Sequence, residues 1–274
     1  MRDVRWLAVW GAFLAILASA CGDEDSGSAV SGPASPLRIT VSQTAGAIDA
    51  RAGGSHVHVS TDPFQLALTP AGAPDVTEDT TGLYFVAAAG QHVSLDRVAA
   101  SHATATELQL TVDTSAGAAT VALSFPREGV ARVALTPPAD AGATAAGERL
   151  VSPVDERIYG LMERTVTDLV RSEYIPMEVG SLDRRGTQVT MSVIQSIALY
   201  TPFFQTSRGY GVFVEGTTKG TYDLAMTEPD VLAFQFELPP GVKSFSYLCI
   251  GGPSHDELLD RYTAITGRPF IPPE

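Results

Sequence analysis

The chain has 274 residues, of which 45% are hydrophobic, and its 31 acidic side chains outnumber 18 basic ones, giving a formal net charge of −13. A protein that binds the phosphate backbone of nucleic acid needs clustered Lys and Arg, and this sequence has no basic run. We therefore expect no nucleic-acid partner.

The first twenty residues have the plan of a secretory signal. A short basic start with Arg2 and Arg5 is followed by the apolar run Trp6–Ala18 and then by small residues. Because a helix needs roughly 20 apolar residues to cross a bilayer, this run is too short for a membrane span. We predict a signal peptide over residues 1–20 and secretion across the bacterial inner membrane.

Small residues directly before Cys21 resemble a bacterial lipobox, in which the cysteine is acylated. The segment 21–36 is acidic and rich in Gly, Ser and Pro, a composition typical of a flexible tether. We predict lipidation at Cys21 and an anchor at the membrane of the cell envelope; the alternative is an ordinary secretory signal cleaved nearby. With Cys21 acylated, Cys249 is the only other thiol, so no intrachain disulfide is expected.

Residues 37–252 are predicted to form an all-β, antiparallel β-sandwich. Short runs rich in Val, Thr, Leu and Phe occur from Leu37 to Pro137, and several alternate apolar and polar residues, as in Leu108–Val112. After a small-residue break at Pro137–Gly147, interpreted as a loop or as the join between two halves, strands resume. The later predicted strands are Arg157–Leu161, Gln188–Ile194, Gly211–Glu215, Thr221–Met226, Leu232–Leu238 and Ser244–Ile250. Strands at this spacing without helices between them favour a sandwich.

One helix is predicted, starting at Ser254. Ser254 and Glu257 have the spacing of a capping box, and Leu258, Tyr262 and Ile265 then share one face at helical spacing. Gly267 and Pro269 end the element. A single late helix after a long β region indicates a passage into a different domain.

Three segments carry a family resemblance. They are ERIYGLMER at Glu156–Arg164, TPFFQTSRGYGVFVEG at Thr201–Gly216 and TGRPFIPP at Thr266–Pro273. Together they resemble the region before the catalytic barrel of glycoside hydrolase family 31, which holds α-glucosidases and α-xylosidases. The resemblance implies a galactose-mutarotase-like sandwich, with residues 253–274 as helix and linker toward a (β/α)8 barrel absent from this chain.

The residues of these segments are interpreted mainly as packing. Gly160 has the features of a tight backbone site, and Gly211 leaves room for a neighbouring backbone. The strand after the turn is predicted to place Tyr210, Val212 and Val214 on one face.

The resemblance also implies that a loop of this region reaches the sugar pocket, where the family often supplies a carboxylate. The corresponding stretch Thr190–Ser196 contains no acid, so Gln195 is the substitute candidate for substrate binding. Arg184 and Arg185, in the stretch Gly180–Gly186, are the other candidates; the alternative for both is a solvated turn.

No catalytic residue is predicted. A retaining glycosidase needs two carboxyl groups roughly 5 to 5.5 Å apart, and the family takes both from its barrel. This chain has no Trp-x-Asp-Met motif, and acidic runs such as Glu78-Asp79 are typical of a solvated surface. No cofactor is expected, and the chain alone is expected to be inactive.

His56 and His58 alternate within a strand pattern, so both rings point to one face and could bind a metal as a pair. No nearby Cys or third His completes a site, so no metal is predicted and an exposed or core-edge pair is favoured.

The sequence predicts the non-catalytic N-terminal β-sandwich of a secreted or lipid-anchored α-glycosidase. Its partner would be α-linked carbohydrate, bound through the barrel. One alternative is a stand-alone surface lipoprotein whose sandwich binds glycan or protein. The other is an enzyme with its own site at His56 and His58.

Overall fold

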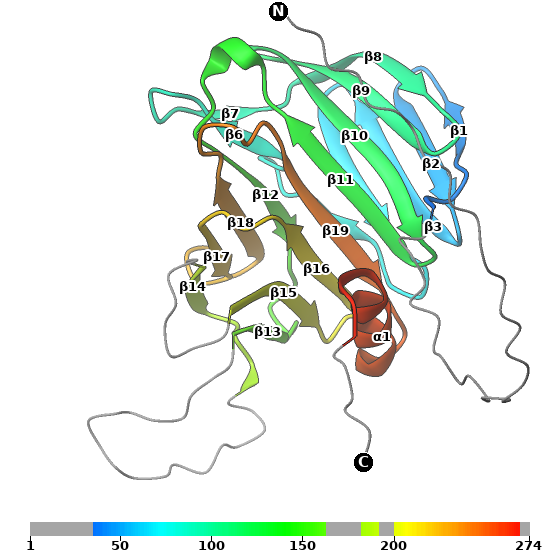
Figure 1. Cartoon of the computed structure of the whole chain (residues 1–274), viewed down its shortest axis with the longest axis vertical. Coiled ribbons are helices and arrows are strands. Elements are labelled where there is room, and N and C mark those ends of the chain that lie inside the picture. Colours follow the sequence, from blue (N-terminus) through cyan, green and yellow to red (C-terminus); the bar gives the residue numbers. More distant parts are fainter. Residues whose placement is uncertain (1–34, 163–181, 192–199, 269–274) are drawn as a thin grey trace, which may run out of the picture. The chain divides into compact units, whose positions relative to one another are not determined.

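The computed structural model describes residues 35–162, 182–191 and 200–268 (Figure 1). Within these ranges the chain forms three β-sheets and one α-helix. The predicted signal peptide, the acylation site Cys21, most of the predicted tether and Gln195 lie outside the described residues.

The first sheet has five strands in chain order, and each pairs antiparallel with the next. Its strands are β1 (Thr40–Gln43), β2 (Ala47–Ala52), β3 (Ser55–Thr61), β4 (Phe64–Thr69) and β5 (Val76–Thr77).

The second sheet has eight strands in the order β13-β15-β16-β19-β11-β10-β9-β8. These are β8 (Arg97–Ala103), β9 (Glu107–Thr114), β10 (Gly117–Arg127), β11 (Val130–Thr136), β13 (Ile158–Met162), β15 (Tyr200–Thr206), β16 (Tyr210–Glu215) and β19 (Phe245–Gly251).

The third sheet has six strands in the order β14-β17-β18-β12-β6-β7. These are β6 (Tyr84–Val86), β7 (His92–Ser94), β12 (Ala145–Val151), β14 (Thr187–Met191), β17 (Gly220–Leu224) and β18 (Val231–Glu237).

One hydrophobic core draws on all three sheets. Ile48 of β2, Leu123 of β10 and Phe234 of β18 belong to the same buried cluster and are at most 1% exposed. The eight-stranded sheet therefore packs face to face on the other two, and in Figure 1 its strands β10 and β11 lie in front of β2 and β3. The predicted all-β sandwich is confirmed.

The five- and six-stranded sheets meet where the chain leaves β5. Glu78 forms an antiparallel bridge with Leu150 of β12, and the Asp79 amide donates to the Arg149 carbonyl at 3.0 Å. These contacts join the two sheets edge to edge into one layer of the sandwich.

The predicted strand alternation is clearest in β9. Leu108, Leu110 and Val112 are buried, whereas Gln109 and Thr111 are exposed. This is the period-two pattern of a strand that has one face on the core.

The small-residue break at Pro137–Gly147 is only partly a loop. A short 3-10 turn at Ala139–Ala141 is followed by β12, which pairs with β18 on one side and β6 on the other. Both faces of its first half are buried, so the sequence there shows no alternation. Strands β2, β5, β7, β8 and β15 were likewise not predicted.

The predicted helix is confirmed as α1 (His255–Thr266). The Ser254 side chain caps it by accepting from the Glu257 amide at 3.2 Å, and Gly267 follows its last turn at φ 97°. Leu258 is fully buried in a second, smaller hydrophobic cluster that it shares with residues of the sheet. Tyr262 and Ile265 pack against this cluster. Among the residues that the structure covers, no helix has the length and apolar character needed to cross a membrane.

Strand β19 is buried along its whole length. Its inner face, including Phe245 and Cys249, belongs to the main core, while Leu248 and Ile250 on the outer face pack with Leu258 of α1. Cys249 is a free, fully buried thiol, and burial raises its pKa above the ordinary value.

Candidate functional site

The described parts of the segments that carry the family resemblance lie at one corner of the eight-stranded sheet. β13 pairs with β15, placing Ile158 opposite Thr206, and β15 pairs with β16, placing Phe203 opposite Phe213. Helix α1, whose last turn begins the third segment, lies against this corner (Figure 1). The Tyr262 ring stacks on Phe203 with the ring centroids 4.2 Å apart. We call β13, β15, β16 and α1 the signature corner.

Two glycines allow the strands of the signature corner to approach closely. A Cβ on Gly160 would lie 2.7 Å from the Phe203 carbonyl oxygen, and one on Gly211 would lie 2.7 Å from that of Phe204. Gly160 also has φ at 112°. Both predicted close approaches are confirmed. The predicted inner face of β16 is also confirmed, since its members are at most 1% exposed: Tyr210, Val212 and Val214.

The candidate Arg185 holds two loops together beside the signature corner. Its Nη1 donates to Ser152 Oγ at 2.8 Å and to the Glu156 carbonyl at 3.2 Å. Its Nη2 donates to the carbonyls of Ser152 and Pro229. The guanidinium of Arg185 therefore ties the end of β12 to the loop before β18.

Arg184 lies next to this clamp. Its peptide nitrogen donates to the Ile158 carbonyl at 2.7 Å, and both Arg184 and Arg185 are half-buried. Asp183 fixes the turn by accepting from the amides of Ile158 and Arg185, each at 3.0 Å. The two arginines thus share one ordered turn at the edge of the sandwich, and a contact with sugar stays a prediction for them, as for Gln195.

Two buried carboxyl groups meet at the junction of the five- and six-stranded sheets. Glu78 is 3% exposed and Glu148 is fully buried. Glu78 accepts hydrogen bonds from the amides of Leu66 at 2.6 Å and Leu83 at 3.2 Å. Glu148 accepts one from the Tyr247 hydroxyl at 2.9 Å. The run Glu78-Asp79 was expected at the surface, and this expectation is wrong for Glu78.

Burial changes the acidity of this pair. It raises the pKa of Glu78 to about 8, and burial followed by the charge of Glu78 raises the pKa of Glu148 well above its ordinary value. At neutral pH the pair therefore retains at least one proton. Both carboxyl groups belong to the interior, which favours a structural role over a catalytic one.

The polar run Glu78-Asp79 also has a partner on β12. The Asp79 carboxylate lies 2.7 Å from Nε of Arg149, and the Asp79 side chain is only 11% exposed. The opposite ends of the Arg149 guanidinium thus engage Asp79 and, at 2.7 Å, Glu228. Glu78 and Asp79 directly follow β5, which ends against β12. Both acids therefore lie at the junction of the two sheets.

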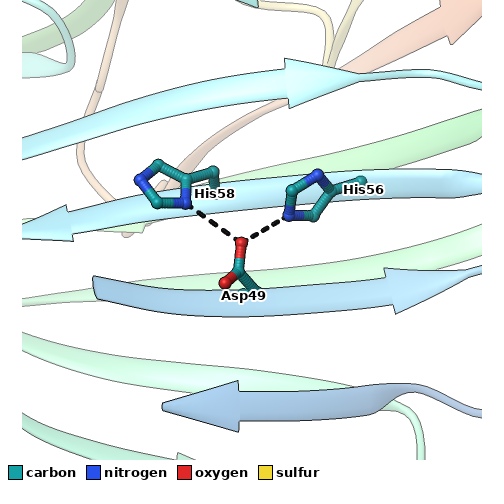
Figure 2. A group of neighbouring side chains, drawn as sticks. All are labelled: Asp49, His56 and His58. Carbon is teal, nitrogen blue, oxygen red and sulfur yellow. Dashed lines mark hydrogen bonds and ion pairs between the residues drawn. The ribbon is translucent and has the colours of Figure 1, made fainter. Parts of the chain in front are cut away.

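A second polar cluster lies on the outer face of the five-stranded sheet (Figure 2). The rings of His56 and His58 from β3 both face Asp49 of β2. Nε2 of His56 lies 2.5 Å and Nδ1 of His58 lies 3.0 Å from the same oxygen, Asp49 Oδ1. The hydrogen bond from His58 is the largest influence that lowers the pKa of Asp49.

The predicted orientation of the histidine pair is correct, and Asp49 was missed. Within the part of the chain that the structure covers, Asp49, His56 and His58 are the one set of three His, Cys, Asp or Glu residues with ligand atoms within 4.8 Å of one another. The signal was available: Gly53-Gly54 is a two-residue hairpin turn, and such a turn places Asp49 opposite His58.

Comparison with known proteins gives partial matches. No family model matches the chain. The alpha-xylosidase XylQ of Lactiplantibacillus pentosus is 32% identical over 126 residues, which are 46% of this chain and 15% of that enzyme. The chain therefore spans only a minor part of the curated relative.

Solved structures share the fold. A protein of Listeria monocytogenes EGD-e, crystallised with alpha-D-glucose, beta-D-glucose, magnesium and calcium, gives a TM-score of 0.54 at 15% identity over 86% of this chain and 30% of its own. A GH31 family sulfoquinovosidase from E. rectale, in complex with an aza-sugar inhibitor, gives 0.50 at 12% identity over 84% of this chain and 34% of its own. The chain is thus similar in sequence to a part of an alpha-xylosidase, and it shares its fold with parts of these two solved structures, one of which is a GH31 family enzyme.

Proposed function

We propose that this chain is the non-catalytic N-terminal β-sandwich of an α-glycosidase acting on α-linked carbohydrate, and that it supports the catalytic barrel and its sugar pocket. The observation that carries the proposal is the 32% identity to an alpha-xylosidase over 126 residues, which are 15% of that enzyme. The signature corner supports the same assignment, because its paired strands β13, β15 and β16 contain two of the segments that resemble the family.

The proposal places catalysis outside this chain. The buried pair Glu78 and Glu148 belongs to the sandwich interior, and Asp49 is engaged by two histidines. A retaining glycosidase needs two carboxyl groups that both reach the sugar. In this account Arg184, Arg185 and Gln195 would contribute sugar contacts only where the pocket of the barrel lies next to their loops.

Activity of the purified chain tests the proposal. Aryl α-xylosides and α-glucosides are incubated with the chain and with an Asp49→Asn/Glu78→Gln variant as a matched control. We expect neither protein to release the aryl group faster than buffer does. Turnover by the chain that the variant loses would assign catalysis to the sandwich and overturn the proposal.

We further propose that the chain is exported and acylated at Cys21. The support is the sequence alone: a basic start, the apolar run Trp6–Ala18 and small residues before the cysteine. Expression in a bacterium with Cys21→Ser as the comparison tests this. The proposal predicts that the unmodified chain fractionates with membranes and that the variant is released; equal fractionation of both would contradict acylation.

A further inference from the structure

The cluster of Asp49, His56 and His58 is built by the pairing of two strands. In the β2–β3 register Asp49 lies directly opposite His58, and His56 lies two residues away on the same strand. Alternate residues of a strand point to the same face, so the three side chains share the outer face of the sheet. Ile48, Val57 and Val59, which alternate with them, are buried in the core.

The three side chains already converge on one point. Two imidazole nitrogens approach a single carboxylate oxygen at 2.5 and 3.0 Å, as Figure 2 shows. Around a tetrahedral zinc ion with bonds of about 2.0 to 2.1 Å, neighbouring ligand atoms lie roughly 3.3 Å apart. Small rotations of the side chains would therefore open enough space for an ion among the three ligand atoms.

The cluster is also accessible from solvent. The side chains of Asp49 and His56 are 22% and 23% exposed, and that of His58 is 42% exposed. An ion can therefore enter without opening the core. A shallow hollow beside His58, lined by Ser60, Gln65 and Thr77 among others, adds room on the same face.

The donor set selects a class of ion. Imidazole nitrogen suits zinc, copper, iron and nickel, whereas calcium and magnesium prefer shells made of oxygen atoms. Two imidazoles with one carboxylate leave the fourth position of a tetrahedral shell for water or another small ligand.

We propose that Asp49, His56 and His58 bind one divalent transition-metal cation of the zinc class on the outer face of the five-stranded sheet. The ion replaces the two hydrogen bonds to Asp49 Oδ1 with three metal–ligand bonds. Because Asp49 belongs to β2 and the histidines to β3, the ion cross-links the two strands of the hairpin. This site is independent of sugar hydrolysis.

Titration with Co²⁺ tests the proposal, because visible absorption of Co²⁺ reports its coordination. The full chain is prepared without a histidine tag, treated with a chelator and carries Cys21→Ser in every sample. The chain has five histidines, so His102→Asn, at an exposed position of β8, is a matched control. Circular dichroism checks that every variant is folded.

We expect one Co²⁺ per chain, displaced by Zn²⁺ and not by Ca²⁺ or Mg²⁺, with His102→Asn unchanged. His56→Asn, His58→Asn and Asp49→Asn should each weaken binding by at least about tenfold, because each removes one of three ligands. Asp49→Asn keeps the side-chain shape, so it tests the ligand without disturbing packing. Absence of stoichiometric binding, or equal affinity in all the folded variants, would overturn the proposal.

Discussion

At the scale of single residues, Glu78 and Glu148 couple the stability of the fold to pH. The pKa of Glu78 is raised from 4.5 to about 8 by burial. A carboxyl group with a raised folded-state pKa stabilises the fold fully below the pKa of the unfolded chain, and this contribution is lost as the pH rises through the folded value. The pH range over which this stabilisation is lost therefore runs from about pH 4.5 to beyond pH 8.

We predict that the free energy of unfolding falls as the pH rises from 5 to 9 and that Glu78→Gln/Glu148→Gln removes most of this fall. A neutral amide resembles the protonated acid and has no proton to lose in this range. Over this pH window, the fall in the free energy of unfolding should be smaller in the variant by roughly 2 to 4 kcal/mol. Urea unfolding of both proteins at each pH measures it, and parallel pH profiles would show that the pair does not titrate as described.

A second prediction concerns the close approach at Gly160. Gly160→Ala adds a Cβ 2.7 Å from the Phe203 carbonyl oxygen, whereas Gly216, at a similar φ of 119°, has no neighbour within 4 Å. Both substitutions strain the backbone, and only Gly160→Ala adds overpacking, which costs typically about 1 to 3 kcal/mol. Urea unfolding should show a larger loss for Gly160→Ala than for Gly216→Ala. Equal losses would mean that strands β13 and β15 separate without penalty.

These residues also show what sequence patterns reveal and what they leave out. The close approaches of Gly160 and Gly211 and the shared face of His56 and His58 follow from local spacing. The meeting of Glu78 with Glu148 does not, because it depends on β5 ending against a strand far along the chain. Asp49 is intermediate, since a Gly-Gly turn predicts its register with β3.

At the scale of elements, α1 is attached to strands β15 and β19 by one buried face. Leu258 is fully buried, whereas its neighbour Leu259 is 43% exposed. Strand β19 is buried throughout, because the core covers its inner face and Leu258 of α1 packs with Leu248 and Ile250 on its outer face. Helix and strand therefore depend on each other for burial.

We predict that Leu258→Ala destabilises the protein by about 2 to 5 kcal/mol, because it leaves a cavity between α1 and the sheet. Leu259→Ala, with the same change on the exposed face, should shift stability by less than about 0.5 kcal/mol. Urea unfolding of the two variants separates packing from helix propensity, which both share. Similar losses for the two variants would contradict the docking of α1 through Leu258.

Several strands that sequence reasoning missed lie in environments that give no alternating pattern. Strand β9, with one face on the core, alternates and was predicted, whereas β2 was missed although its burial alternates. The first half of β12 is buried on both faces and is made of small residues and Glu148, and edge strand β8 is mostly exposed. Neither environment produces a period-two pattern, so local sequence does not mark them as strands.

At the scale of the whole molecule, the described residues form a sandwich of three sheets with one shared core. Spacing and alternation predict the class of fold, while the edge-to-edge junction at Glu78 becomes visible only in three dimensions. The fold alone does not give the function. The assignment to an α-glycosidase depends on the sequence match to an alpha-xylosidase and on the segments that form the signature corner.

The length of the native polypeptide tests this assignment most directly. An antibody against the sandwich, used on an immunoblot of the source organism, reports the size of the protein that contains it. Because the chain spans 15% of the alpha-xylosidase that it matches, the account predicts a band several times longer than 274 residues. Mass spectrometry of that band should find a barrel with a Trp-x-Asp motif. A native protein of 274 residues or fewer would contradict the account.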